Sequence, residues 1–148
     1  MSPGHVVPPE PRSIAAGDPL PPLQLDVTAT LIAAGAIATR DFMPVHHDRA
    51  YANAQGAPDI FMNILSDTGY CSRFLTDWAG PEAMVRRLAI RLGVPVFPGD
   101  RLSYTGEVAE VAVEGDEVVV EVGFRATTAL GDHVTGTATL TLPATARP

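Results

Sequence analysis

Asp41 and His46 place a carboxylate and an imidazole five residues apart, in the run Asp-Phe-Met-Pro-Val-His. Pro44 lies between them; it fixes its own φ, lacks a backbone donor and keeps the preceding residue out of the helical region. A bent loop of this kind can direct both side chains to one point, where they could polarise a water or a small molecule. The spacing therefore predicts an acid–base site in which His46 is a candidate general base near neutral pH.

Simpler roles exist for the polar residues of this segment. Asp41 alone could cap the turn that follows it. Adjacent histidines point apart and no HxxxH spacing accompanies His46 and His47, so we expect no metal site. His47 is predicted to be a surface or packing group at the start of a short helix that follows, and His133 to make a structural hydrogen bond.

The composition narrows the possible functions. With 148 residues and 46% hydrophobic content, the chain is expected to form one packed domain. The net charge of −7 argues against nucleic-acid binding, and the absence of lysine excludes Schiff-base and P-loop chemistry. No apolar run reaches the ~18 residues of a membrane span, and no secretory signal is apparent. Cys71 is the one cysteine, which fits a reducing cytoplasm.

The elements before the acid–base loop are predicted from local patterns. Residues 1–22 hold seven of the fourteen prolines (3, 8, 9, 11, 19, 21 and 22) and are expected to form a flexible tail ahead of a domain spanning 23–148. Alternation over 23–30 indicates a half-buried strand, and the small apolar residues of 33–40 indicate a second short strand.

A long helix is predicted over 60–78. Pro58 and Asp59 resemble a helix entry, apolar residues recur at helical spacing, and Gly80-Pro81 is a strong stop. Beyond it the apolar period becomes two, which predicts strands over 84–94, 101–113, 117–128 and 133–142 in an antiparallel meander. The expected architecture is an α+β domain whose sheet wraps around the long helix.

These elements, with Asp41, Pro44, His46 and Ala52 at matching positions, resemble the MaoC-like (R)-specific enoyl-CoA hydratases. That family has the hot-dog fold, and its signature runs Asp-x-Asn-Pro-x-His, five residues, then Ala or Ser. Two positions depart from the family pattern: Met43 replaces the Asn, which bears on the loop geometry, and Arg40 stands where Gly is frequent.

A closer resemblance extends over most of the chain after residue 22. It is carried by several long stretches, 38–42, 45–49, 59–61, 63–65, 76–81, 91–95 and 130–134. They look like the small MaoC subunit of actinobacterial hydratases that act on the shortened cholesterol side chain. The resemblance implies hydration of a steroid 17-ene acyl-CoA and no cofactor other than the coenzyme A of the substrate. It also implies a heteromer with a second, larger hot-dog chain and a link to a downstream thiolase-like aldolase.

The resemblance also assigns roles. Asp41 and His46 would activate water, with the order of their proton transfers left open. Asn63 occupies the position of a family glycine whose backbone N–H meets the thioester carbonyl, at the start of a long helix where amides are unpaired. Arg86, Arg87 and Arg91 could contact coenzyme A phosphates, although solvated strand edges or salt bridges between subunits fit them better.

Two other functions stay open at the level of sequence. A hot-dog acyl-CoA thioesterase would use a carboxylate on the long helix, Asp59 or Asp67, and would leave the Asp41–His46 spacing unexplained. A non-catalytic subunit could instead complete the pocket of a partner hydratase.

Overall fold

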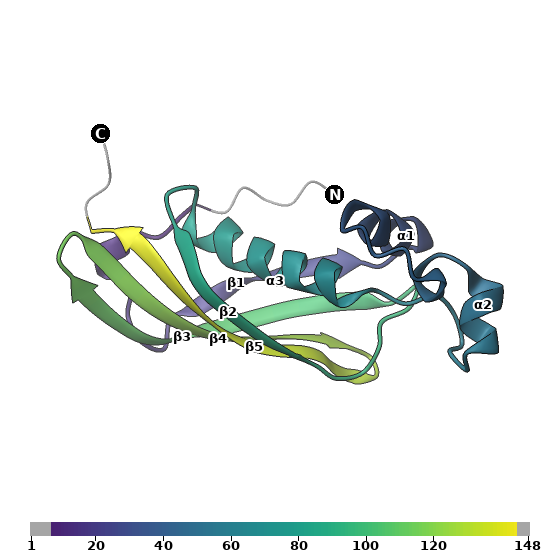
Figure 1. Cartoon of the computed structure of the whole chain (residues 1–148). Helices are drawn as coiled ribbons and strands as arrows, with labels where there is room; N and C mark the ends of the chain where they lie inside the picture. The colour runs from purple at the N-terminus through teal and green to yellow at the C-terminus, as the bar shows by residue number, and fades with distance from the viewer. Residues whose placement is uncertain (1–6, 145–148) are drawn as a thin grey trace.

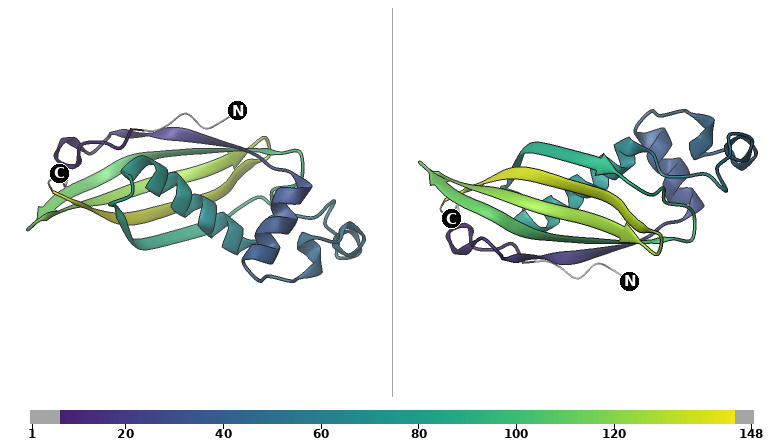
Figure 2. Two further views of the ribbon diagram at one scale, coloured as in Figure 1. Left: turned by 90° about the horizontal axis from the view of Figure 1, so that it is seen from above. Right: turned by 90° about the horizontal axis from the view of Figure 1, so that it is seen from below.

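A single curved sheet wrapped around one helix dominates the computed structural model, which describes residues 7–144 (Figure 1). Within that range the sheet has five antiparallel strands in the order β1-β3-β4-β5-β2. Their bounds are β1 Pro19–Asp26, β2 Met84–Leu92, β3 Arg101–Glu114, β4 Glu117–Thr128 and β5 Gly131–Pro143. Figure 2 shows the helix α3, Ile64–Ala79, lying along one face of the sheet and leaving the other face open. This is the predicted α+β arrangement, with the long helix enclosed by the sheet.

The core forms where the apolar faces of the helix and the sheet meet. Cys71, Phe74, Leu75 and Trp78 recur at helical spacing on α3 and are buried. Alternate residues of the central strands face them, among them Val118, Val120 and Val122 on β4. Gly106 on β3 permits the close packing, because a Cβ there would lie 3.1 Å from the ring of Phe74.

The predicted order of the strands is wrong at one connection. The segment 93–100 does not form a hairpin; it crosses the end of the sheet, so that β2 pairs with β5 and β3 pairs with β1 and β4. Pro95 and Pro98 in this segment lack the donors that a tight two-strand turn uses. Val96 is instead buried at the end of the sheet, and its carbonyl accepts from Met62 N.

The first helix is also a correction, because the predicted strand over 33–40 is the helix α1, Ala29–Ala38. The Thr28 side chain caps it by accepting from Leu31 N at 3.0 Å. Ile32 and Ala36, four residues apart, form its buried face. A short run of small apolar residues fits a strand or a helix equally well. Here the Thr28 N-cap favours the helix.

The long helix begins later than predicted, at Ile64 rather than at residue 60. Asp59 does not start it, because its carboxylate bonds Arg49 Nε at 2.8 Å and Ile60 N at 2.7 Å. Asn63 is the N-cap and accepts from Ser66 N. Gly80, at a φ of 88°, ends the helix at the predicted stop.

The predicted boundary at residue 22 is wrong, because it falls within β1. Proline is tolerated there since β1 is an edge strand, and the register shifts between Leu20 and Leu23. The residues before β1 also pack on the domain: Ile14 is buried in the core and Arg12 Nε donates to Ala144 O at 2.7 Å. Residues 1–6 of the predicted tail lie outside the described residues.

Candidate active site

Asp41 is positioned by the end of α1. The Arg40 N–H donates to Ile37 O and the Asp41 N–H to Ala36 O, the paired bonds of a Schellman motif. Arg40 occupies the position of this motif that requires a left-handed backbone, and its φ is 59°. The same backbone requirement explains why glycine is frequent at this position in the family, because glycine adopts a positive φ without strain. The helix terminus thereby fixes the backbone from which the Asp41 carboxylate projects.

His46 is positioned by a short 3-10 turn, Pro44–His46, whose first residue is proline as the loop chemistry predicts. The imidazole is 7% exposed, and its Nδ1 lies 2.7 Å from the carbonyl oxygen of Phe61. A carbonyl oxygen can only accept, so Nδ1 carries the proton in the neutral ring. The lone pair is therefore on Nε2, the nitrogen that faces Asp41.

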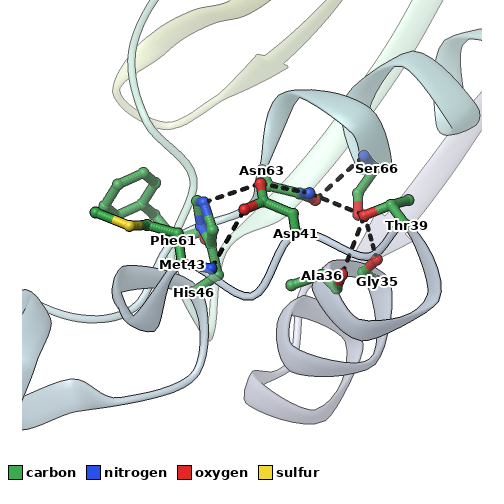
Figure 3. Close-up of polar contacts among 9 residues, drawn as sticks. All are labelled: Gly35, Ala36, Thr39, Asp41, Met43, His46, Phe61, Asn63 and Ser66. Atoms are coloured by element: carbon green, nitrogen blue, oxygen red, sulfur yellow. Dashed lines mark hydrogen bonds and ion pairs between the residues drawn. The ribbon is translucent and has the colours of Figure 1, made fainter.

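The side chains of Asp41 and His46 meet, with Asp41 Oδ2 3.5 Å from His46 Nε2 (Figure 3). Asn63 Nδ2 donates to the same carboxylate oxygen at 3.0 Å, and Met43 N donates to Oδ1 at 3.3 Å. These bonds, the Asn63 amide foremost and then the Met43 N–H and the nearby imidazole, hold the pKa of Asp41 below its ordinary value. Asp41 is consequently an anion at neutral pH.

Asn63 connects the pair to two helices. Its Nδ2 also donates to Thr39 Oγ1 at 3.0 Å, and Thr39 in turn donates to Gly35 O on α1 at 2.8 Å. Its Oδ1 accepts from Ser66 N on α3 at 3.2 Å. The orientation of the amide follows from chemistry, because only the NH₂ group can donate to a carboxylate. One buried side chain therefore sets the distance between the end of α1 and the start of α3.

The arrangement can hold and deprotonate a water. Neutral His46 presents a lone pair on Nε2 and Asp41 presents a carboxylate oxygen beside it, so the two groups face each other as acceptors. A water molecule can satisfy both by donating one hydrogen to each. The backbone N–H of Asn63 lies at the positive end of α3, where negative charge is favoured.

Met43, the departure from the family signature, leaves this geometry intact. Its side chain is exposed, and its contribution to Asp41 comes from the backbone N–H, which any residue but proline supplies. The loop therefore keeps Asp41 and His46 together without the family's Asn.

The carboxylates that a thioesterase would use are engaged elsewhere. Asp59 forms an ion pair with Arg49, and Asp67 is fully buried against the sheet with His133 Nε2 2.8 Å from its Oδ1. Neither can reach a thioester carbonyl at the Asp41–His46 site without breaking those contacts. His133 makes the structural hydrogen bond that the sequence predicts, to Val94 O as well as to Asp67.

The remaining candidates lie away from this pair. Arg86 on β2 donates to Thr141 on β5 and to Glu117 on β4, so its ion pair lies within this chain rather than between subunits. Arg91 lines a shallow hollow of about 750 Å³ on the outer face of the sheet, which includes neither Asp41 nor His46. Cys71 is buried under α3, where desolvation raises the pKa of its thiol to about 12 and leaves it unreactive.

Thr39 and the Phe61 carbonyl are functional groups that inspection of the sequence misses. Thr39 carries no motif beyond its place before Asp41, although a hydroxyl in the last turn of a helix could have been weighed as a partner. Phe61 contributes a backbone atom, so its residue type gives no signal at all.

Exposed apolar side chains occur on the segments that carry and adjoin the pair. Ile37, Phe42, Ile64 and Leu65 are each about half exposed or more, on α1, the loop and the first turn of α3. Exposed apolar side chains gathered near a polar site are typical of a protein interface or of a ligand channel. Within the described residues, every helix falls short of the length and apolar character that a bilayer crossing requires.

Comparison with known proteins gives concordant matches. A family model described as "MaoC like domain" matches residues 14–130. The "3-oxo-4,17-pregnadiene-20-carboxyl-CoA hydratase beta subunit" of Mycobacterium tuberculosis is 49% identical over 126 residues, which cover 85% of this chain and 95% of that protein.

Solved structures agree with this match. A chain of the ChsH1–ChsH2 complex from M. tuberculosis superposes with a TM-score of 0.80 at 46% identity, covering 86% of this chain and 98% of its own. The (R)-hydratase of A. caviae involved in PHA biosynthesis gives a TM-score of 0.78 at 26% identity, covering 89% and 99%. The hot-dog fold expected from the sequence is thereby confirmed.

Proposed function

Because the chain belongs to the MaoC-like domain family, we propose that it is a subunit of an enoyl-CoA hydratase and carries catalytic groups of that enzyme. The reaction adds water across the 2-enoyl double bond of an acyl-CoA thioester. The observation that carries the proposal is the orientation of His46, whose Nδ1 is tied to Phe61 O while Nε2 faces the Asp41 carboxylate at 3.5 Å.

His46 is the proton carrier in this proposal. The neutral imidazole takes a proton from water through Nε2 as the water oxygen bonds to the β-carbon, and the electrons of the double bond move onto the thioester oxygen. The imidazolium then returns the same proton to the α-carbon as the enolate collapses. Hydroxyl and hydrogen both come from one water and arrive on one face of the double bond.

Asp41 keeps its charge through the cycle. Its pKa is lowered, first by the Asn63 amide and then by the Met43 N–H, so it accepts a hydrogen bond from the water rather than a proton. It orients the attacking oxygen and stabilises the imidazolium 3.5 Å away.

The Asn63 backbone N–H is the proposed donor to the thioester oxygen. It stands at the N-cap of α3, where the helix leaves amides without carbonyl partners and its dipole stabilises a developing enolate. Among the described residues, this N–H has no hydrogen-bond acceptor. The reaction needs no cofactor, because water, acid–base groups and an oxyanion donor complete it.

The proposed substrate is a steroid side-chain acyl-CoA with a 17-ene, by likeness to the M. tuberculosis beta subunit. Hydration of such a substrate produces a tertiary alcohol at the β-carbon. The carbon that bears the hydroxyl group of a tertiary alcohol has no hydrogen, so the alcohol cannot be oxidised to a ketone. Carbon–carbon bond cleavage is therefore the reaction expected in the next step. This extends the proposal to a thiolase-like aldolase as the enzyme that consumes the product.

A second hot-dog chain is the proposed partner. The apolar residues around Asp41 and His46 are exposed in this chain, and a partner that covered them would exclude water from the acyl group. The related M. tuberculosis chain was solved in a complex of ChsH1 with ChsH2.

The test is to co-express the chain with its second hot-dog subunit and follow the loss of enoyl absorbance. Asp41→Asn and His46→Gln should each lower kcat/KM by at least ~10²-fold, whereas His47→Gln, on the exposed side of the same loop, should not change it. Free thiol is measured in parallel, because its release would indicate a thioesterase. Wild-type rates in both variants would assign the chemistry to the partner and contradict the proposal.

A further inference from the structure

A second aspartate–histidine pair lies inside the domain and has no part in the proposed water activation. Asp67 is on α3 with its side chain fully buried, and His133 is 3% exposed near the start of β5. His133 Nε2 lies 2.8 Å from Asp67 Oδ1, and His133 Nδ1 lies 2.6 Å from Val94 O. The imidazole thus bridges the helix and the segment that follows β2.

The hydrogen-bond partners indicate the charge of this pair. The Val94 carbonyl can only accept, so Nδ1 carries a proton, and the facing carboxylate oxygen favours a second proton on Nε2. Burial alone would lower the pKa of His133, but the hydrogen bond to Asp67 and its charge outweigh that effect and raise the pKa above the ordinary value.

Among residues 7–144, the titratable groups that act on this pair offer Asp67 no other cation. Tyr70 and Cys71 lie on α3, Tyr104 faces the pair from β3 and Asp100 from the segment before β3. These groups can be neutral or negative, never positive, and burial raises the pKa of both Cys71 and Tyr104. Asp67 Oδ2 has no hydrogen-bond partner among the described residues, so its carboxylate depends on His133.

The pair is coupled to the candidate active site through one turn of helix. Asp67 N donates to Asn63 O at 3.1 Å, and Asn63 carries both the amide that bonds Asp41 and the proposed oxyanion donor. On the other side, Gly93 N donates to His133 O at 2.7 Å and Val94 N to Asp132 O at 3.0 Å. Through His133, the first turn of α3 is therefore joined to β5 and to the segment that follows β2.

We propose that Asp67 and His133 form a buried ion pair. The pair holds the first turn of α3 against the sheet, and its two charges cancel, so that it adds no net charge beside the oxyanion donor. Both are positioning residues, and this role rests on the proposed hydratase function. The backbone of Asp67 lies about one helical turn, ~5.4 Å along α3, from that of Asn63, whose N–H is the proposed donor to the developing negative charge.

The charge has a predictable consequence for the rate. When His133 loses its proton, the unpaired Asp67 anion opposes the enolate across one helical turn, and the hydration rate should fall by at least about tenfold. The fall occurs as pH rises, on the alkaline side of the ordinary imidazole value. Asp67→Asn removes the anion and should remove this decrease. At neutral pH the hydration rate of the variant should not exceed that of the wild type.

The experiment uses the assembled complex with this chain labelled with ¹⁵N. Imidazole nitrogen shifts are recorded from pH 5 to 10, and His5→Gln, His46→Gln and His47→Gln identify the three other rings. The pair is ionised if the His133 ring has protons on both nitrogens at pH 7 and loses one only well above 6.5, while Asp67→Asn makes the ring neutral at pH 7. A neutral His133 at pH 7 in the wild type would overturn the proposal.

The kinetic arm measures kcat/KM over the same pH range for wild type, Asp67→Asn, His133→Gln and the double variant. We expect an alkaline decrease that follows the His133 titration in the wild type only, a low rate at every pH in His133→Gln, and recovery in the neutral double variant. An identical alkaline decrease in Asp67→Asn would contradict the proposal even with an ionised pair. If no variant and no wild type hydrates at any pH, the hydratase proposal fails, while the nitrogen shifts still decide the ionised pair.

Discussion

Asn63 and Asp41, 22 residues apart in the chain, are joined by a hydrogen bond of 3.0 Å from the Asn63 amide to the Asp41 carboxylate. The same amide caps α3 through Ser66 N, so the anion of the candidate site and the first turn of the long helix share one side chain. Asn63, at the position of a family glycine, therefore links the Asp41 carboxylate to the first turn of α3. Its two tasks, capping and holding the carboxylate, can be separated by substitution.

We predict that Asn63→Ser and Asn63→Ala lower the hydration rate equally but differ in stability. Both lack the amide donor to Asp41, and loss of a hydrogen bond to a charged group should cost at least about tenfold in rate. Serine still caps the helix, so only the alanine variant should lose about 1 kcal/mol of unfolding free energy. Urea unfolding and kcat/KM measure the two effects. Equal rates in Asn63→Ser and wild type would show that the amide does not support Asp41.

Arg40→Gly should stabilise the chain without changing its rate. Arg40 is the non-glycine residue with a positive φ, 59°, in the described part of the chain, and a left-handed backbone costs a side chain of this kind roughly 1 kcal/mol. Glycine removes that strain and the N–H bonds of the motif stay, so Tm should rise by a few degrees. Arg40→Ala, which removes the guanidinium and keeps the strain, is the matched control. A gain in Arg40→Ala as large as in Arg40→Gly would rule out backbone strain as the cause.

Gly35→Ala should destabilise the contact between α1 and α3. A Cβ on Gly35 would overlap Ser66 Oγ, a buried hydroxyl without a hydrogen-bond partner among the described residues. Overpacking of this kind costs about 1–3 kcal/mol, more than the helix propensity that alanine gains.

Ser66→Ala supplies the control for this clash. Alone it should be close to neutral in unfolding free energy, because it removes a buried hydroxyl that has no hydrogen-bond partner in the described part of the chain. The double variant Gly35→Ala/Ser66→Ala should recover wild-type stability or exceed it. Simple addition of the two single effects in the double variant would show that the residues do not touch.

Stability should decline on the alkaline side through His133. Its pKa is raised in the folded chain, so its contribution is fully present below the ordinary imidazole pKa of about 6.5 and is lost as pH rises through the folded value. Urea midpoints from pH 6 to 10 should fall with pH in the wild type and stay flatter in Asp67→Asn. A wild-type midpoint that stays level across this range would contradict the raised pKa.

The sequence predicts those features whose causes are local. The alternation of apolar residues in β4 and β5, the helical spacing from Cys71 to Trp78 and the stop at Gly80 depend on neighbours within a turn or a strand, and the structure confirms them. The acid–base spacing of Asp41 and His46 is local for the same reason, since Pro44 fixes its own φ and restricts Met43 within the short segment that joins them. Fold class and family follow from these features.

The tertiary structure decides what depends on distant partners. A Thr28 cap and packing of Ile32 and Ala36 make a helix of a segment whose composition also fits a strand. The prolines within β1 are tolerated only because that strand lies at an edge of the sheet, which the sequence does not specify.

The same limit applies to the site. By itself the sequence determined which acid and base face each other, because a short rigid loop allows few alternatives. Only the folded chain brings Phe61 O to His46, Asn63 to Asp41 and His133 to Asp67, across 15, 22 and 66 residues. Contacts over such separations are set by how the helix lies on the sheet, and no pattern within a single element encodes that placement.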